Sequence, residues 1–349
     1  MSDIALQQLL ACIAEHRGEG LWVVDENLQA DLVPEAAAQS IRLISNRVDV
    51  VEQLRDKSYR AQLSDFDFSA IAPQSLDCAY YRVSKEKPVV HWVLNQLAER
   101  IKPGGMLFLA GYKNEGTKTY FDKARERFGG AAEKKLLGKT AMLCRISRSE
   151  QLGPALDDKA YSEMRPLADQ QPMLLTKPGV YGWQKQDKGS QLLIDCLPEV
   201  LSRRQADNKA IVRLLDLGCG YGFISVEAAK LTDAYIVATD NNVAAVDVCR
   251  ANFELQQING EVLADDCGQQ LAAGFDLILC NPPFHQGFDV SSELSEKFIR
   301  QAARLLKPGG YVLWVVNAFL GVEAHYRAYF SRQQQLLNNK QFKVILCEK

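Results

Sequence analysis

Residues 211–222, IVRLLDLGCGYG, decide the fold of this chain. An apolar run that reads as a buried strand ends at Asp216. Three evenly spaced glycines follow it: Gly218, Gly220 and Gly222. Glycines let the backbone turn sharply and approach a ligand that a Cβ atom would exclude. The next residues have helical spacing, and a dinucleotide-binding loop would need glycine at Phe223, so the pattern predicts a different nucleoside-binding α/β fold.

Acidic residues end the next two predicted strands. The segment AYIVATD ends in Asp240, about 20 residues past the glycines, where a carboxylate can accept from ribose hydroxyls. The segment GEVLADD ends in Asp265 and Asp266, where a side chain can bond an adenine amino group. Each of these aspartates alone is more typical of a helix cap or a turn. They belong to the argument because they end two successive predicted strands after the glycine loop.

A fourth signal stands at residues 281–284, directly after the apolar run FDLILC. The two prolines, Pro282 and Pro283, fix φ and remove two backbone donors. The side-chain oxygen of Asn281 and the carbonyl of Pro282 can then both accept from one planar NH2 group. Phe284 can stack on a base, a contact worth roughly 1–3 kcal/mol. Asn-Pro also occurs in ordinary turns, so the tetrapeptide gains its meaning from the motifs upstream.

The order of glycine loop, two acids and NPPF resembles that of class I S-adenosylmethionine-dependent methyltransferases. This resemblance implies S-adenosylmethionine as methyl donor. A sulfonium methyl group is a strong electrophile, so the reaction needs in-line placement and a dry site rather than a metal. No general base is evident. His285 is next to the loop, but we expect it to pack or to hydrogen-bond, and the proton to leave to water.

Two parts of the sequence repeat each other. Residues 76–112 and 275–317 both give an apolar strand, a loop, an amphipathic helix, a KPGG turn and a second apolar strand. In the first copy residues 82–85 align with NPPF, and no glycine loop precedes them. We therefore predict an α/β protein with two tandem Rossmann-like domains, each a mostly parallel twisted sheet flanked by helices. Residues 1–150 form the degenerate copy, 151–190 a linker and entry segment, and 191–349 the catalytic domain. At the C-terminus we expect a long helical stretch and then QFKVILCEK as the last strand of the second sheet.

Composition narrows the class of protein. The chain has 349 residues, enough for two domains, and 47% of them are hydrophobic. No apolar stretch approaches about 18 residues, and the first 20 residues read as an amphipathic helix rather than a signal peptide. The nine cysteines form no CxxC pair and the four histidines are scattered. We expect reduced cysteines, a cytoplasmic protein and no metal.

Charge is unevenly distributed along the chain. The net charge is −2, but residues 1–81 carry 6 Lys/Arg against 13 Asp/Glu, and residues 82–150 carry 15 against 7. The second block includes Lys102, Lys113 and Lys118 and is a candidate RNA-binding surface. Alternatively, these side chains simply solvate helix faces, and the first copy serves only as a folding partner.

With the duplication, the motifs resemble bacterial ribosomal RNA guanine-N2 methyltransferases, most closely those of the small-subunit 16S type. The resemblance is close over KPGVYGWQKQDKGSQLL, the glycine loop, NPPFH, VNAFL and FKV, and architectural over the first 150 residues. It implies cofactor binding by the glycine loop, Asp240 and Asp266, with Gly189 and Ser190 bordering the methionine end, and guanine N2 at residues 281–284. The implied partner is 16S ribosomal RNA or the 30S subunit, bound by a monomer, with no DNA and no membrane.

Alternatives share the same motifs. A sister enzyme methylates guanine N2 in 23S ribosomal RNA. Glutamine-N5 protein methyltransferases and adenine-N6 enzymes also offer a planar NH2 group to an NPP(Y/F) loop, but the silent first copy and the phenylalanine favour guanine in RNA. A non-enzymatic RNA-binding folding assistant is a further alternative. The intact glycines and Asn281 weigh against it.

Overall fold

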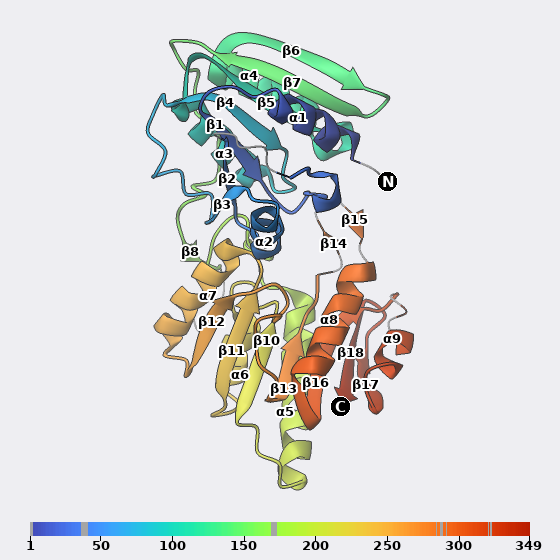
Figure 1. Cartoon of the computed structure of the whole chain (residues 1–349). Coiled ribbons are helices and arrows are strands. Elements are labelled where there is room, and N and C mark those ends of the chain that lie inside the picture. Colours follow the sequence, from blue (N-terminus) through green and yellow to red (C-terminus); the bar gives the residue numbers. More distant parts are fainter. Residues whose placement is uncertain are drawn as a thin grey trace. The chain divides into compact units, whose positions relative to one another are not determined.

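The computed structural model describes residues 3–35, 41–168, 173–283, 285–286, 289–290, 292–319, 321 and 323–349. The chain forms two compact units, Met1–Tyr161 and Ser162–Lys349 (Figure 1). Each contains a seven-stranded sheet flanked by helices, so the predicted fold class and the duplication are confirmed. No helix in the described ranges is long and apolar enough to cross a membrane.

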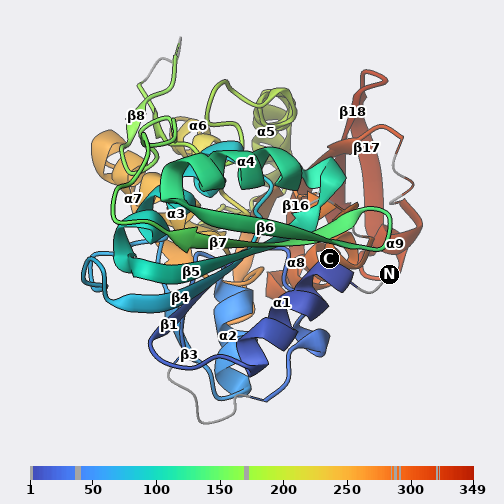
Figure 2. The ribbon, with the colours of Figure 1, turned by 90° about the horizontal axis from the view of Figure 1, so that it is seen from above.

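Unit 1 begins with the predicted amphipathic helix, and its sheet has the order β3-β2-β1-β4-β5-β7-β6. The first five strands in this order are parallel, β7 is antiparallel to β5, and β6 is antiparallel to β7. Helices α1 and α2 pack on one face and α3 and α4 on the other (Figure 2). The elements are α1 (Ile4–Ala14), β1 (Gly20–Val24), β2 (Ile41–Ser45), α2 (Val48–Asp56), β3 (Arg60–Leu63), β4 (Leu76–Arg82), α3 (Lys87–Arg100), β5 (Ile101–Tyr112), α4 (Thr117–Phe128), β6 (Gly129–Leu137) and β7 (Ala141–Arg148), with short 3-10 turns at Ala30–Leu32 and Lys113–Glu115.

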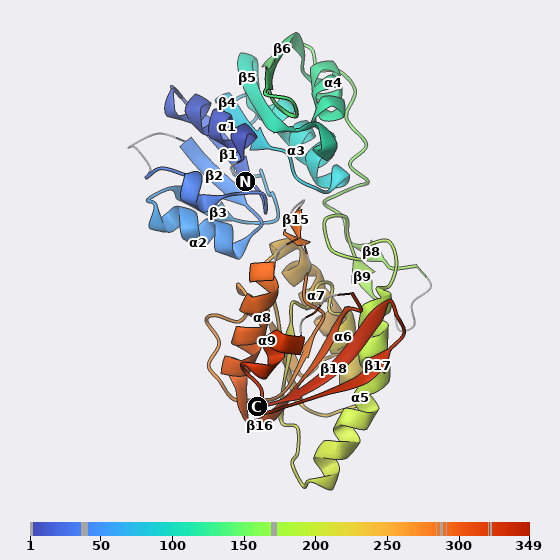
Figure 3. The same cartoon turned by 90° about the vertical axis from the view of Figure 1, so that its right-hand side faces the viewer.

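Unit 2 repeats this order as β12-β11-β10-β13-β16-β18-β17. Helices α5, α6 and α7 cover one face of its sheet and α8 and α9 the other (Figure 3). The elements are β8 (Arg165–Pro166), β9 (Leu175–Thr176), α5 (Lys188–Ala206), β10 (Arg213–Leu217), α6 (Phe223–Ala229), β11 (Tyr235–Asp240), α7 (Val243–Gln256), β12 (Gly260–Ala264), β13 (Phe275–Cys280), β14 (His285–Gln286), β15 (Asp289–Val290), α8 (Ser292–Leu305), β16 (Leu306–Asn317), α9 (Glu323–Arg327), β17 (Arg332–Asn338) and β18 (Phe342–Glu348).

The segment predicted as a linker divides between the two units. Unit 1 extends to Tyr161 rather than to residue 150, because the added residues pack on α3. The amide of Leu156 donates to Asn95 Oδ1 at 2.9 Å, and Tyr161 is buried in the core of unit 1. The following residues belong to unit 2, where the amide of Leu175 donates to Asn252 Oδ1 of α7 at 2.7 Å.

The C-terminal region differs from the prediction in one element. We expected a long helical stretch before the last strand, but the structure has the short helix α9 and then strand β17. The sequence RQQQLLN is polar and lacks the alternation of a half-buried strand, because β17 is an edge strand whose residues are mostly exposed. The predicted last strand, β18, is confirmed.

A matching ion pair ties the amino ends of the strands in both units. Lys102 of the first KPGG segment lies 2.6 Å from Asp77 Oδ1, and Lys307 of the second lies 2.8 Å from Asp276 Oδ1. Both segments bulge out of the sheet within β5 and β16, where the strand pairing shifts register. Although partial burial opposes it, hydrogen bonds from Lys307 and two backbone amides hold the pKa of Asp276 below its usual value. We call this pair the amino-edge staple.

Candidate functional site

The glycine loop connects β10 to α6 at the carboxyl edge of the parallel strands of unit 2. Its three glycines all have positive φ, between 55° and 87°, which side chains rarely adopt. A Cβ atom at Gly222 would lie 2.7 Å from Cys249 Sγ, so this glycine permits close packing of α6 on α7. A Cβ atom at Gly220 would meet nothing within 4 Å. Gly220 therefore faces open space that a ligand can occupy.

Asp216 lies beneath this loop and is fully buried. Its Oδ2 accepts hydrogen bonds from the backbone amide and the hydroxyl of Ser225, at 3.0 and 2.7 Å. Its Oδ1 has no partner among the described residues. Burial raises the pKa of Asp216 to about 7, although the Ser225 donors oppose the shift. A buried acceptor without a donor is expected to bind one from a ligand.

Asp240 stands at the end of β11, next to the loop. Its Oδ2 accepts from the backbone amide of Gly220 at 2.9 Å, and its Oδ1 accepts from the amide of Asn242 at 2.9 Å. The carboxylate thus holds the glycine loop in place. It also lies at the edge of the sheet where the sequence places a ribose.

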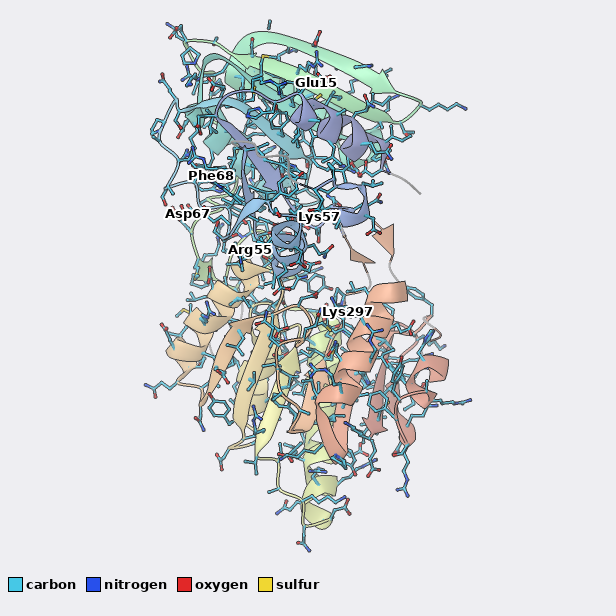
Figure 4. All side chains as sticks on the ribbon, in the orientation of Figure 1. Glu15, Arg55, Lys57, Asp67, Phe68 and Lys297 are labelled. Atoms are coloured by element: carbon cyan, nitrogen blue, oxygen red, sulfur yellow. The ribbon has the colours of Figure 1, made fainter. Side chains whose placement is uncertain are left out.

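The two acids after β12 have different surroundings. Both oxygens of Asp265 accept from backbone amides, those of Gln269 and Gln270, at 2.7 and 3.0 Å. Asp266 instead uses one oxygen, Oδ2, which accepts from the side chains of Gln269 and of Lys297. Lys297 comes from α8 (Figure 4). Since Asp265 is occupied by its own loop, Asp266 is the better candidate for a ligand contact.

Asn281 follows β13, the strand next to β10. Its side-chain nitrogen donates to Asp187 Oδ2 and to Ser190 Oγ, both at 2.9 Å. Its Oδ1 has no hydrogen-bond partner within the described ranges. Pro282 is buried and Pro283 exposed, whereas Phe284 lies outside the described residues. The amide oxygen of Asn281 is therefore available to a ligand at this corner.

The N-terminus of α5 forms the adjoining wall. Asp187 caps this helix by accepting from the amide of Ser190 at 2.8 Å. A Cβ atom at Gly189 would lie 3.0 Å from Asp187 Oδ2 and 3.3 Å from Phe342. This close packing explains why glycine stands there and brings the predicted Gly189–Ser190 segment into contact with Asn281.

Sequence reasoning missed three partners of the predicted residues: Asp187, Ser225 and Lys297. Asp187 could have been found, because an Asp shortly before an apolar helical run is a signal for the N-cap of a helix. Ser225 and Lys297 carry no local signal. They reach their aspartates only through the packing of α6 and α8.

The structure also limits other chemistry. In the part of the chain that the structure describes, no group of three His, Cys, Asp or Glu side chains could hold a metal ion. A cavity of about 350 Å³ is lined by Arg204, Lys209 and Leu231, among others, and contains none of the predicted site residues. All nine cysteines are unpaired, and six of them are buried.

The basic block of unit 1 is less of a surface than its sequence count suggests. Arg82, Arg127 and Arg148 are buried. Lys102 belongs to the amino-edge staple at one end of β5, and Lys113 follows the other end of the same strand. Lys113 and Lys118 are exposed. The three lysines grouped by sequence therefore do not form one patch.

Comparisons with known proteins identify the family of this chain. A family model described as the methyltransferase small domain matches residues 171–346. A ribosomal RNA small subunit methyltransferase C of Hahella chejuensis is 30% identical over 264 residues, covering 74% of each chain. One from Haemophilus influenzae is 28% identical over 297 residues, covering 82% of this chain and 83% of the relative.

A solved structure extends the likeness to the whole chain. The 16S rRNA N2 G1207 methyltransferase of T. thermophilus, in complex with AdoMet and guanosine, superposes with a TM-score of 0.81 at 25% identity. The match covers 98% of this chain and 91% of that one, so it includes both units. The chain belongs to the methyltransferase small domain proteins and, within them, to the family of ribosomal RNA small subunit methyltransferases C.

Proposed function

We propose that this protein transfers a methyl group from S-adenosylmethionine to the exocyclic N2 of a guanine in 16S ribosomal RNA. One observation carries the proposal. The amide oxygen of Asn281 is unpartnered among the described residues and stands at the strand end next to the glycine loop. An acceptor in this place suits a planar NH2 group beside a bound nucleoside. The family membership gives the class of substrate.

The cofactor fits the residues present. The open space at Gly220 can hold the part of S-adenosylmethionine that lies against the glycine loop. Oδ1 of Asp216, which has no partner among the described residues, can accept from the ammonium group of the methionine moiety. We assign Asp240 to the ribose hydroxyls because, unlike Asp265, it is only partly buried, and each of its oxygens can accept a second hydrogen bond. We assign Asp266, with one oxygen free of partners among the described residues, to the adenine amino group. When bound, S-adenosylmethionine supplies an electrophilic methyl carbon.

The residues at 281–284 prepare the nucleophile. Guanine N2 is a poor nucleophile because its lone pair is delocalised into the ring. Acceptors at Asn281 Oδ1 and the carbonyl of Pro282 hold both N–H groups and favour a geometry in which this lone pair is freer. Positive charge develops on N2 as the new bond forms, so the same dipoles stabilise the transition state more than the ground state. Phe284 stacks on the base, and the proton leaves to water after transfer.

The target base must be unpaired or turned out of its stack to enter this corner. Phosphate contacts supply most of the affinity for the surrounding RNA, and the exposed lysines of unit 1, Lys113 and Lys118, contribute to them. In this proposal the protein acts in the cytoplasm as a monomer on 16S RNA, free or assembled in the 30S subunit.

The test is methyl transfer to defined substrates. The protein is incubated with labelled methyl donor and 30S subunits, 50S subunits, free 16S RNA or free 23S RNA, and the modified base is mapped. We expect one N2-methylguanine in 16S RNA. Methylation of 23S RNA would make it the large-subunit enzyme, and labelling of a glutamine in a protein would replace the RNA substrate. No transfer to any of these, with retained RNA binding, would favour the folding assistant.

A further inference from the structure

Asp187 does more than cap α5. Its carboxylate accepts hydrogen bonds from three groups that lie far apart in the sequence or on different elements. Oδ2 accepts from the amide of Ser190 at 2.8 Å and from Asn281 Nδ2 at 2.9 Å, and Oδ1 accepts from the hydroxyl of Tyr181 at 3.0 Å. Capping needs only the first of these bonds. The bond to Asn281 joins the cap to the tetrapeptide after β13.

This bond fixes which way the amide of Asn281 faces. A carboxylate can only accept, so the NH2 end of the amide must point to Asp187 and the oxygen must point away from it. The Ser190 hydroxyl oxygen, 2.9 Å from the same Nδ2, supports this orientation. If the amide turned over, it would present two donors to the incoming amine, which is itself a donor.

Among the residues that the structure describes, the charge of Asp187 has no cationic partner. No Lys or Arg side chain in the described ranges forms an ion pair with it. A negative charge on the nitrogen side of an amide polarises the group and makes its oxygen a stronger acceptor. The carboxylate therefore acts through Asn281 on whatever bonds to Oδ1.

We propose that Asp187 is a positioning residue for methyl transfer: it orients and polarises the amide of Asn281, so that Oδ1 holds the target amine and stabilises its charge. The inference rests on the proposed function. In the step itself the N2–carbon bond forms as the sulfur–carbon bond breaks, and N2 carries the positive charge until a proton leaves to water. Asp187 lies one amide group from that charge.

The first test is Asp187→Asn, measured in single turnovers with saturating RNA and cofactor. Asn caps helices about as well as Asp, so the variant should fold, and its cofactor affinity should change less than about threefold. The rate should fall about ten- to hundredfold, the range expected when a supporting partner of a site residue is lost. Should Asp187→Asn fold poorly, Asp187→Ser, which also caps but has no charge, should show the same loss of rate.

The second test is exchange of the two side chains. Asn281→Asp places a carboxylate against Asp187, so the pair repel each other and the rate falls. The double variant Asp187→Asn with Asn281→Asp restores one amide and one carboxylate in reversed positions. Its rate should exceed that of Asn281→Asp alone. Losses that add would mean that the two side chains do not act on the rate through their contact.

Asp3→Asn is the matched control, because Asp3 is also an aspartate that caps a helix, α1 of unit 1. Because Asp3 also pairs with the buried Arg82, the variant should lower stability, but it should leave the transfer rate of the folded protein unchanged. A wild-type rate for Asp187→Asn, or additive losses in the exchange, would overturn the inference while inactivity of Asn281→Ala kept the proposed function intact. A wild-type rate for Asn281→Ala would instead overturn the proposed function itself.

Discussion

The two units have the same strand order, but different kinds of residues stand at the carboxyl edges of their sheets. In unit 2 the central strands end in Asp216, the glycine loop and Asn281, with unpartnered acceptors and open space. In unit 1 the strand register places Trp22 where unit 2 has Asp216, and Arg82 where it has Asn281. Trp22 is fully buried. The duplicated sheet therefore does not need the site chemistry in order to fold.

In unit 1, ion pairs occupy the carboxyl edge that corresponds to the candidate site of unit 2. Arg82 is buried and forms two hydrogen bonds with Glu115, at 2.6 and 2.7 Å, and one with Asp3 at 3.0 Å. Arg47 pairs in the same way with Asp25 at 3.3 Å, after β1. Polar groups that would otherwise await a ligand are satisfied within the unit. The comparison indicates that the edge able to bind a ligand is the one whose hydrogen-bond acceptors have no donor within the same unit.

Removing Arg82 should break unit 1 most severely. Arg82→Met leaves two buried carboxylates without their cation, which is expected to cost about 3–5 kcal/mol of stability. Urea unfolding measures this. Arg145→Met, which removes an exposed pair with Glu133, is the control and should cost less than about 1 kcal/mol. Equal costs for the two variants would mean that the Arg82 cluster does not hold unit 1 together.

Removing Asn281 should break unit 2 in function and not in folding. Asn281→Ala deletes the acceptor, so the transfer rate should fall at least about a hundredfold, as when a transition-state contact is lost. Cofactor affinity, measured by calorimetry, should stay within a few-fold of wild type. Loss of cofactor binding instead would place Asn281 in the cofactor site.

Filling the space at Gly220 should make the carboxyl edge of unit 2 resemble that of unit 1. Gly220→Val introduces bulk where a cofactor would lie, which should weaken its binding by about 1–3 kcal/mol, or roughly ten- to hundredfold. Gly138→Val is the matched control, because Gly138 also has positive φ and open space but lies in the β6–β7 hairpin. If both variants bound cofactor equally well, the open space would not be the cofactor site.

The buried acid should make cofactor binding depend on pH. Asp216, with its pKa near 7, must be ionised to accept an ammonium group, so affinity should rise as pH increases from 6 to 8, with a slope of about tenfold per unit below 7. Because the folded pKa lies above the unfolded one, stability without cofactor should fall as pH rises from about 4 to 7. Asp216→Asn should flatten both profiles, and an unchanged affinity profile in that variant would assign the titration to another group.

The smallest effect is expected at the exposed lysines of unit 1. Replacing Lys113 and Lys118 with glutamate should weaken RNA binding and flatten its dependence on salt by about one unit of slope per lost phosphate contact. Filter binding at several salt concentrations measures this. Lys102→Glu, at the other end of β5, should act mainly on stability. Unchanged RNA affinity in the double variant would leave unit 1 with a structural role only.

The sequence predicted the fold, and it predicted that the candidate residues at the strand ends lie at one edge of the sheet, for a physical reason. Parallel strands bring their carboxyl ends to one edge, so motifs at strand ends meet whatever their separation along the chain. The contacts of Ser225 and Lys297 with the aspartates could not be predicted, because they depend on how α6 and α8 pack. The choice between Asp265 and Asp266 needed the local backbone, which occupies Asp265. Strand β17 was not predicted because its mostly exposed residues show no alternation of apolar and polar side chains.

The amino-edge staple was retained by both copies, although it takes no part in methyl transfer. Its aspartate also accepts from the backbone that begins the neighbouring central strand, from Glu19 in unit 1 and from Val212 and Arg213 in unit 2. The two units thus share these folding contacts, whereas they do not share the residues of the candidate site. An Asp near the start of one strand and a KPGG lysine at the start of the next can help to identify inactive copies of this fold in other duplicated proteins. The pattern is useful where such a copy has no binding motif.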